Sequence, residues 1–280
     1  MTNIDIINKL RQLDLSKYPY EDVKDLISHF SPMFVRMSIS GSLLIERLRP
    51  GNGFVKRSEV GYKLGSVEDQ PNRATIPGRS IFYGTIAHPR ENATNRRYIA
   101  LCESSTLLNQ GLKASGREHY TLSIWGINRP LKVGFIVNDK AFENRNNVIL
   151  QEAKDYYNAN RSFIEKPLGM DLYKDFVVDQ FSMAVDDSQR YKYIIPATIA
   201  DYMMYASGLD GVVYPSVKAD GHAGMNIALK KECVDEALIL LNVEELEYAQ
   251  DSGVASVRII KREPMTIYEE DAHGLLKWAW

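Results

Sequence analysis

The chain has 280 residues, of which 45% are hydrophobic and 25% are charged, as is typical of a globular protein built around one large domain. Lys and Arg total 34 and Asp and Glu total 36, so the formal net charge of −2 gives no general attraction to nucleic acids or acidic membranes. Cys102 and Cys233 fit neither a CxxC metal site nor a disulfide framework, and we expect two buried thiols in a reducing compartment.

The start of the chain predicts two amphipathic helices. Ile4, Ile6, Ile7, Leu10 and Leu13 have roughly helical spacing, a second apolar stripe follows over residues 20–30, and Ser31-Pro32 interrupts the pattern. We expect residues 1–32 to be a helical appendage that caps the core, because an amphipathic stripe must be buried; a surface for a partner is the alternative.

Targeting segments are not evident. No basic segment followed by an apolar run opens the chain, and no stretch approaches about 18 uninterrupted apolar residues. We therefore expect a cytoplasmic protein without a secretory signal or a transmembrane helix.

The middle of the chain predicts mainly strands, because short runs of branched and aromatic residues lie between Gly, Pro and Asn. These runs are residues 33–40, 43–48, 80–86, 120–127, 131–137, 210–217 and 225–229. Helical patterns cover residues 147–160 and 196–207; Pro196 suits a first helical turn, and Gly208 suits a C-terminal cap. The tail from Lys231 alternates between helical and strand-like pieces. The pattern predicts an α+β fold with one mixed domain over residues 33–280.

Arginines accompany two of the predicted strands. Arg47 and Arg49 are two residues apart and would share one face of a strand, where two guanidinium groups could clamp a diphosphate or could simply be solvated. Arg73 precedes the Pro77-Gly78 turn, and Tyr83 follows in the next strand. A ligand phosphate beside Arg73 with a ring stacked on Tyr83, or a hairpin with a core tyrosine, fits this segment equally well.

Two further segments carry polar residues beside apolar runs. Glu103 is either a partly buried acid suited to catalysis or a helix-capping residue next to three residues that favour N-caps. Ser216 ends a buried strand, and Asn226 is expected to anchor the loop between them. No GxSxG elbow surrounds Ser216, which disfavours a serine hydrolase that pairs it with His222. The five histidines show no metal-binding spacing, and no P-loop or GxGxxG motif occurs.

In their order along the chain, these segments resemble the RES-domain family, named for its arginine, glutamate and serine. Residues 45–50 are similar to the first arginine motif, and residues 73–83 to the second arginine, its Pro-Gly turn and its tyrosine strand. Glu103 is the candidate glutamate, and Glu91 stays an alternative. The most specific match covers residues 210–216 and 224–229. The resemblance spans roughly residues 40–230, with residues 145–195 as an expected helical insertion that covers the site as a lid or binds a partner.

The resemblance implies an ADP-ribosyltransferase-like fold and an enzyme that consumes NAD⁺ by hydrolysis or phosphorolysis, without a metal. It implies that Glu103 acts at the ribose and that Arg47 and Arg73 hold the diphosphate. It also implies that Tyr83 stacks on the nicotinamide or ribose side and that Ser216 orients the nicotinamide ribose by hydrogen bonding. Asn226 would complete the NAD⁺ site. Mono-ADP-ribosylation of a protein and a non-enzymatic protein with a decayed site are the alternatives.

Family members include toxins that pair with an antitoxin. The resemblance therefore leaves open a toxin or defence role, an antitoxin or regulatory partner, and a homo-oligomer. It does not imply direct contact with nucleic acid or with a membrane.

Overall fold

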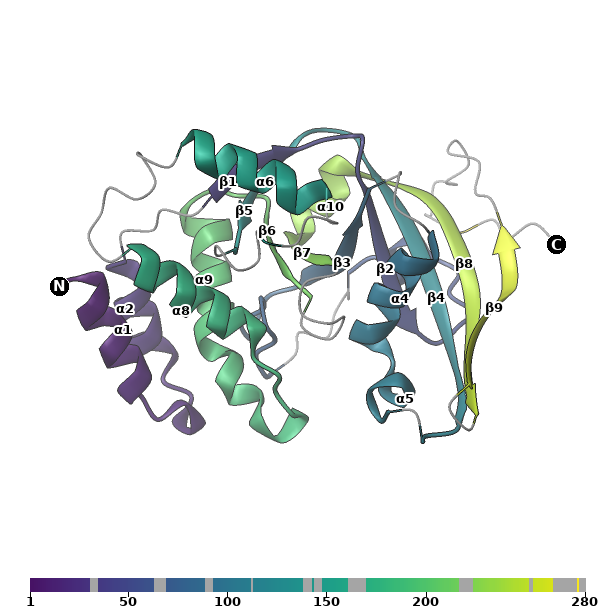
Figure 1. The fold of residues 1–280 in the computed structure, drawn as a ribbon, viewed down its shortest axis with the longest axis horizontal. Helices are drawn as coiled ribbons and strands as arrows, with labels where there is room; N and C mark the ends of the chain where they lie inside the picture. The colour runs from purple at the N-terminus through teal and green to yellow at the C-terminus, as the bar shows by residue number, and fades with distance from the viewer. Residues whose placement is uncertain are drawn as a thin grey trace.

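In the computed structural model, a nine-stranded mixed sheet forms the centre of the protein, with strand order β1-β5-β6-β7-β3-β2-β4-β8-β9 (Figure 1). The structure describes residues 1–30, 35–62, 69–88, 93–111, 113–137, 143, 148–160, 170–216, 224–251, 254–263 and 276. Neighbouring strands are antiparallel except for β5 and β6, which are parallel. The strands are β1 (Val35–Ile39), β2 (Leu44–Pro50), β3 (Ile81–Ala87), β4 (Gly116–Ile127), β5 (Leu131–Phe135), β6 (Gly211–Pro215), β7 (Met225–Lys230), β8 (Leu238–Asp251) and β9 (Val254–Glu263).

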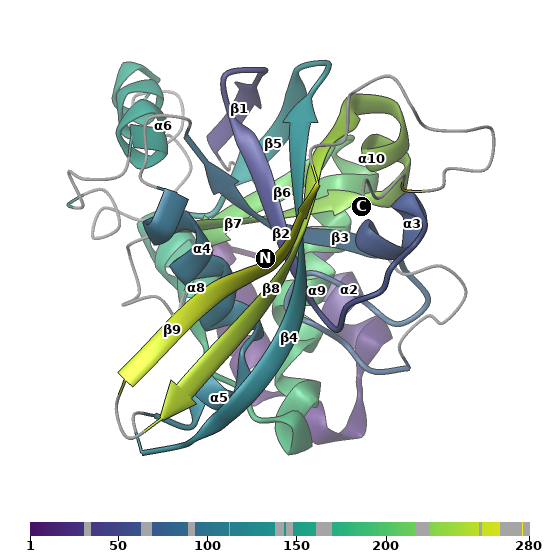
Figure 2. The same cartoon turned by 90° about the vertical axis from the view of Figure 1, so that its right-hand side faces the viewer.

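All seven strands predicted in the middle of the chain are confirmed as β1 to β7, but β8 and β9 were not predicted as a hairpin. Alternation fails in β8 because its buried positions include Glu244, Glu247 and Gln250 and its pairing with β9 shifts register at Glu245. Figure 2 shows β4, β8 and β9 side by side at one end of the sheet.

The predicted N-terminal helices are α1 (Asn3–Gln12) and α2 (Tyr20–Ser28). A capping box between Thr2 and Asp5 begins α1. Ile6, Ile7 and Leu10 are buried, whereas Ile4 is 40% exposed and does not belong to the buried stripe as expected. The two helices share one hydrophobic cluster with α8 (Met170–Ser182) and α9 (Ile194–Asp201), and all four lie together in Figure 1.

The predicted helices of the second half are also present. Residues 147–160 contain α6 (Val148–Ala159), and residues 196–207 overlap α9, which begins two residues earlier and continues into a π-helical turn, η4 (Tyr202–Ala206). Gly208 follows the C-cap residue Ser207 of this turn and has φ +70°, as expected of a C-terminal glycine. The remaining helices in the described part of the chain are η1 (Leu15–Lys17), α3 (Arg57–Val60), α4 (Ala93–Ser104), α5 (Thr106–Asn109), η3 (Asp187–Tyr193) and α10 (Lys231–Ala237).

The sheet opens between β2 and β3. These strands pair only from Leu44 to Glu46, after which β2 stays paired with β4 while β3 stays paired with β7. Arg47 is the first residue of β2 beyond this pairing. The sheet is therefore two halves joined by a short ladder, and the opening between them positions the candidate site.

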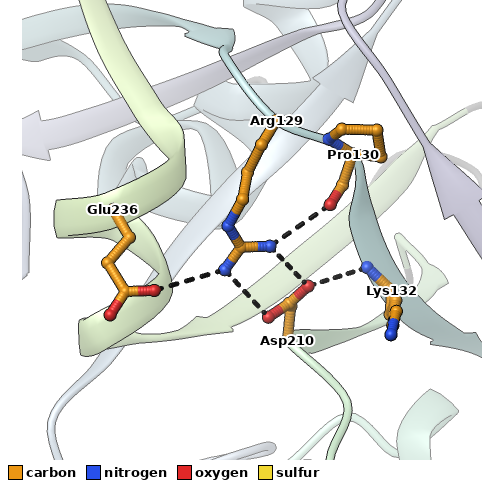
Figure 3. Close-up of polar contacts among 5 residues, drawn as sticks. All are labelled: Arg129, Pro130, Lys132, Asp210 and Glu236. Carbon is orange, nitrogen blue, oxygen red and sulfur yellow. Dashed lines mark hydrogen bonds and ion pairs between the residues drawn. The ribbon is translucent and has the colours of Figure 1, made fainter.

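A cluster of ion pairs fixes the start of β6 (Figure 3). The guanidinium group of Arg129 donates to both carboxylate oxygens of Asp210, at 3.1 and 3.3 Å, and lies 3.5 Å from Glu236 of α10. Asp210 also accepts from the backbone N–H of Lys132 at 2.8 Å. Asp210, which belongs to the most specific family-like motif, thus ties β6 to β5 and does not line the cavity described below.

The cysteines are buried and unlinked, as expected, and burial raises the pKa of Cys233 to about 12. None of the described helices combines the length and apolar character that crossing a membrane requires.

Candidate active site

A cavity of about 650 Å³ lies where β2 and β3 separate, between α4 on one side and η3 on the other. Its lining is more polar than apolar, and both acidic and basic side chains reach it. The residues that line it are Glu46, Arg47, Leu48, Pro50, Asn72, Arg73, Tyr83, Gly84, Thr85, Ala100, Glu103, Ser104, Asp187, Arg190, Tyr193, Tyr214 and Asn226.

Glu103 is held in the cavity wall by two side chains from the half of the sheet that contains β6 and β7. One carboxylate oxygen, Oε1, accepts from the hydroxyl of Ser216 at 2.6 Å and from the amide Nδ2 of Asn226 at 2.8 Å. Ser216 follows β6 and Asn226 lies in β7, more than a hundred residues along the chain from Glu103. The structure thus unites three residues that the sequence singled out separately. Two donors to one oxygen fix the orientation of the carboxylate.

A close approach of α4 to β7 makes these contacts possible. Gly224 lies against Ile99 of α4, and a Cβ atom at position 224 would lie only 2.7 Å from the Ile99 side chain. The carbonyl group of Gly224 also accepts from the N–H of Ser216 at 2.9 Å. A side chain at this position would force Ile99 or α4 itself to shift, which explains why a glycine lies beside the helix that carries Glu103.

The capping role considered for Glu103 belongs to other residues. Ser105 is the N-cap of α5 and accepts from the N–H of Leu108 at 2.9 Å. Glu118 of β4 accepts from the hydroxyls of Ser105 and Thr106 and from the N–H of Leu107 at 3.0 Å. Glu103 lies at the end of the preceding helix and faces the cavity instead.

Arg47 occupies the opening of the sheet. Its Nη1 donates to the carbonyl oxygen of Tyr83 on β3, and its guanidinium carbon lies 5.2 Å from the centre of the Phe82 ring. Burial and the neighbouring charge of Arg49 lower the pKa of Arg47 to about 9, so the group is still a cation at neutral pH. Its buried Nε has no hydrogen-bond partner among the described residues. A buried cation in this position favours an anionic ligand.

Arg49 does not join Arg47 in a diphosphate clamp. It is outside the cavity lining, donates to the carbonyl oxygen of Glu59, and lies 5.1 Å from the centre of the Phe54 ring. The segment that follows β2 folds back over this end of the strand and takes up the second guanidinium group, which strand alternation alone could not show.

Arg73 lies in a tight turn in which Asn72 and Thr75 exchange backbone hydrogen bonds. Its Nη2 donates to the carbonyl oxygen of Met183 at 2.9 Å and to the hydroxyl of Tyr193 at 3.3 Å. Burial lowers the pKa of Arg73, but Tyr214, Tyr193 and the carboxylate of Glu103 outweigh it and raise the pKa above its usual value. Arg73 is therefore a firmly held cation within electrostatic reach of Glu103.

Tyr83 fixes the same turn while its side chain lines the cavity. Its hydroxyl accepts from the N–H of Ala74 at 3.1 Å and bonds to the hydroxyl of Thr75 at 2.5 Å. Gly78 has φ +87°, and the N–H of Arg79 bonds to the carbonyl of Ile76 at 3.3 Å, which confirms the Pro-Gly turn. Tyr83 thus combines a structural role with a place in the cavity wall.

Several residues that line the cavity were not predicted from the sequence. Glu46 is 2% exposed and lies beside Arg47, while Thr85 donates to the Oδ1 of Asn226 at 3.4 Å. Arg190 and Tyr193 come from η3, inside the expected insertion, so this segment supplies one wall of the cavity. A buried glutamate within the apolar run 43–48 was the available signal for Glu46. The alternating basic and aromatic residues of 190–193 were the signal for η3.

Two other residues that the sequence brought forward, Glu91 and His222, lie outside the described residues. Within the described ranges, no group of three or more His, Cys, Asp or Glu side chains could hold a metal ion.

No known protein family matches the chain, and no curated protein sequence is significantly similar to it. Fold and site together define a mixed α/β protein with an opened sheet and a cavity that carries a fixed carboxylate and three arginines.

Proposed function

We propose that the protein cleaves the bond between nicotinamide and ribose in NAD⁺. The observation that carries this proposal is Glu103, fixed by Ser216 and Asn226 in a cavity that also contains Arg47 and Arg73. These are the residues that the RES-domain resemblance implies for such a site. The cavity also falls in the range of volumes typical of small-molecule sites.

The charges of the cavity suit a ligand with a cationic part and an anionic part. Glu103 and Glu46 come from α4 and β2, whereas Arg73 and Arg190 belong to the facing wall built from the 72–75 turn and η3. NAD⁺ carries a cationic nicotinamide ring at one end and a diphosphate in its middle. The ring and its ribose would lie towards Glu103, and the diphosphate towards the arginines.

The chemistry needs one carboxylate at the ribose. When the C–N bond breaks, its electron pair goes to the ring nitrogen, and nicotinamide leaves as a neutral molecule that needs no proton. The ribose carbon becomes an oxocarbenium-like cation, which Glu103 stabilises. Water or phosphate then adds to this carbon, and an incoming water loses one proton to Glu103 or to solvent.

Ser216 would act through Glu103 in this scheme. Ser216 is fully buried, donates to the carboxylate and is not among the residues that line the cavity. In this proposal its hydroxyl would therefore orient the acid, where the resemblance implies a contact with the ribose. Tyr83 would contact the nicotinamide ribose with its ring, since its hydroxyl is engaged by the 72–75 turn.

The test is the Glu103→Gln variant with NAD⁺, with nicotinamide release measured by chromatography. We expect turnover to fall by about 10²–10³-fold, the usual loss when one electrostatic contact to the transition state is removed. Glu232→Gln, an equally small change at an exposed site on α10, is the matched control and should keep full activity. Reactions with and without phosphate identify the acceptor. Equal turnover of the two variants would remove Glu103 from the mechanism.

A further inference from the structure

Two arginines lie on the same wall of the cavity and are connected by two independent contacts. Arg190 of η3 donates through Nη2 to the side-chain oxygen of Asn72, the residue that directly precedes Arg73. Tyr193, three residues after Arg190, accepts from Arg73 at 3.3 Å. Arg73 and Arg190 therefore form one basic wall. Arg47 is separate from it, in the opening between β2 and β3.

The basic wall is built on rigid structure. η3 continues directly into α9, whose residues Ile194 to Ala200 are all buried. On the other side, Asn72 is fixed by its backbone bonds to Thr75, and Tyr83 bonds to the same turn. Side chains held in this way recognise a ligand without paying a large entropic cost for becoming ordered.

The two arginines differ in their distance from the acid. Ala74, the residue after Arg73, bonds to the hydroxyl of Tyr83 on β3, and Thr85 of the same strand bonds to Asn226, a hydrogen-bond partner of Glu103. These contacts place Arg73 on the Glu103 side of the basic wall, in agreement with the contribution of the Glu103 carboxylate to its raised pKa. Arg190 is half-buried and is three residues from Asp187, an exposed lining residue at the cavity mouth. A ligand that extends from Glu103 towards the solvent would meet Arg73 first and Arg190 second.

We infer, on the basis of the proposed function, that Arg190 is a specificity-determining residue that binds the second phosphate of the substrate. Arg73 then holds the phosphate next to the nicotinamide ribose, and Arg190 holds the phosphate next to the adenosine. The enzyme therefore selects a dinucleotide over a mononucleotide. An arginine suits this task because its planar fork of donors matches a phosphate group.

The experiment compares NAD⁺ with nicotinamide mononucleotide, which has the same scissile bond but lacks the adenosine-side phosphate. Arg190→Ala should raise KM for NAD⁺ roughly 10- to 100-fold, the range of a charged hydrogen bond, and change kcat less than about threefold. It should leave the cleavage of nicotinamide mononucleotide unchanged. Arg73→Ala should weaken the binding of both substrates, and so raise both KM values by a similar factor.

Two controls separate recognition from folding. Arg79→Ala removes an arginine whose ion pair with Asp201 lies outside the cavity lining. This variant should keep the KM and kcat of the unchanged protein for both substrates. Arg190→Lys keeps the charge but loses the fork, so it should recover only part of the affinity for NAD⁺. Thermal unfolding of all variants identifies any that fail to fold.

The outcomes are distinct. If the unchanged protein cleaves NAD⁺ and Arg190→Ala slows both substrates equally, or neither, the role assigned to Arg190 is wrong while the proposed function stands. Absence of NAD⁺ cleavage by the unchanged protein overturns the proposed function itself. Calorimetry with ADP-ribose then tests the basic wall independently of activity. If the unchanged protein binds ADP-ribose and Arg190→Ala weakens this binding, the role of the basic wall is supported; if the unchanged protein does not bind ADP-ribose, that role is rejected.

Discussion

At the scale of single residues, the hydroxyl of Thr85 decides which way the amide of Asn226 faces. Thr85 donates to Oδ1 of Asn226, so Nδ2 is the end that remains to donate to Glu103. With the amide reversed, an oxygen would face the carboxylate and repel it. Thr85 would therefore act on the reaction through Asn226, as a positioning residue for the acid.

Thr85→Val keeps the shape of the side chain and removes the donor. We expect kcat for NAD⁺ cleavage to fall about 5- to 10-fold, as for the loss of one neutral hydrogen bond worth about 1 kcal/mol. Thr85→Ser keeps the hydroxyl and should restore most of the rate. Because Thr85 also lines the cavity, KM is measured as well. A change confined to KM would point to a direct contact with the substrate, and an equal loss of kcat in both variants would contradict the role of the hydroxyl.

At the scale of secondary-structure elements, Glu118 attaches α5 to β4. Its carboxylate accepts from Ser105, Thr106, the backbone of Leu107 and, at 2.6 Å, from the hydroxyl of Tyr120. Burial raises the pKa of Glu118, but these donors outweigh it and hold the pKa below the ordinary value of 4.5. The charged carboxylate is thus the form that stabilises this junction, just after the helix that carries Glu103.

The effect of pH on this junction has a defined sign. Because the pKa of Glu118 is lowered on folding, its stabilisation is complete above pH about 4.5 and is lost as the pH falls through the lower pKa of the folded state. Glu118→Gln should lower the free energy of unfolding by about 1–3 kcal/mol at pH 7. The difference from the unchanged protein should shrink towards pH 3. Urea unfolding of both proteins at pH 7 and at pH 3 measures this difference in the free energy of unfolding. A difference that does not depend on pH would contradict the role of the charge.

Elements with a simple periodic pattern could be predicted from the sequence, whereas those with mixed patterns could not. β1 to β7 combine branched residues with clear flanking turns. The helix that carries Glu103, α4, was not predicted because its first turns are polar and its last residues run into the Ser-Thr segment of α5. β8 places glutamates at buried positions, where alternation predicts apolar residues.

The candidate site shows the same limit. Arg47, Arg73, Tyr83, Glu103, Ser216 and Asn226 were selected from local motifs and their order along the chain, and the structure brings them to one place. Arg49 could not be excluded from the site, and Arg190 could not be assigned to it, because their contacts are with segments that return from elsewhere in the fold. Contacts of this kind leave no local pattern.

At the scale of the whole molecule, the N-terminal helices belong to the core that supports the basic wall. Ile6 and Phe30 lie in one hydrophobic cluster with α8 and with the buried face of α9, which continues from η3. The ring of Phe30 lies 4.8 Å from that of Tyr173. Loss of packing at α1 should therefore destabilise the elements that hold Arg190 and Arg73.

The pair of isoleucines on α1 tests this dependence. Ile6 is fully buried and Ile4 is 40% exposed, so the same substitution creates a cavity at one position and not at the other. We expect Ile6→Ala to lower the free energy of unfolding by about 2–5 kcal/mol, and Ile4→Ala to change it by less than about 0.5 kcal/mol. Urea unfolding followed by circular dichroism measures both. If α1 were a separate appendage, Ile6→Ala would melt it alone and leave the main transition in place. A single transition, shifted to lower urea concentration, would show that α1 unfolds together with the core behind the basic wall.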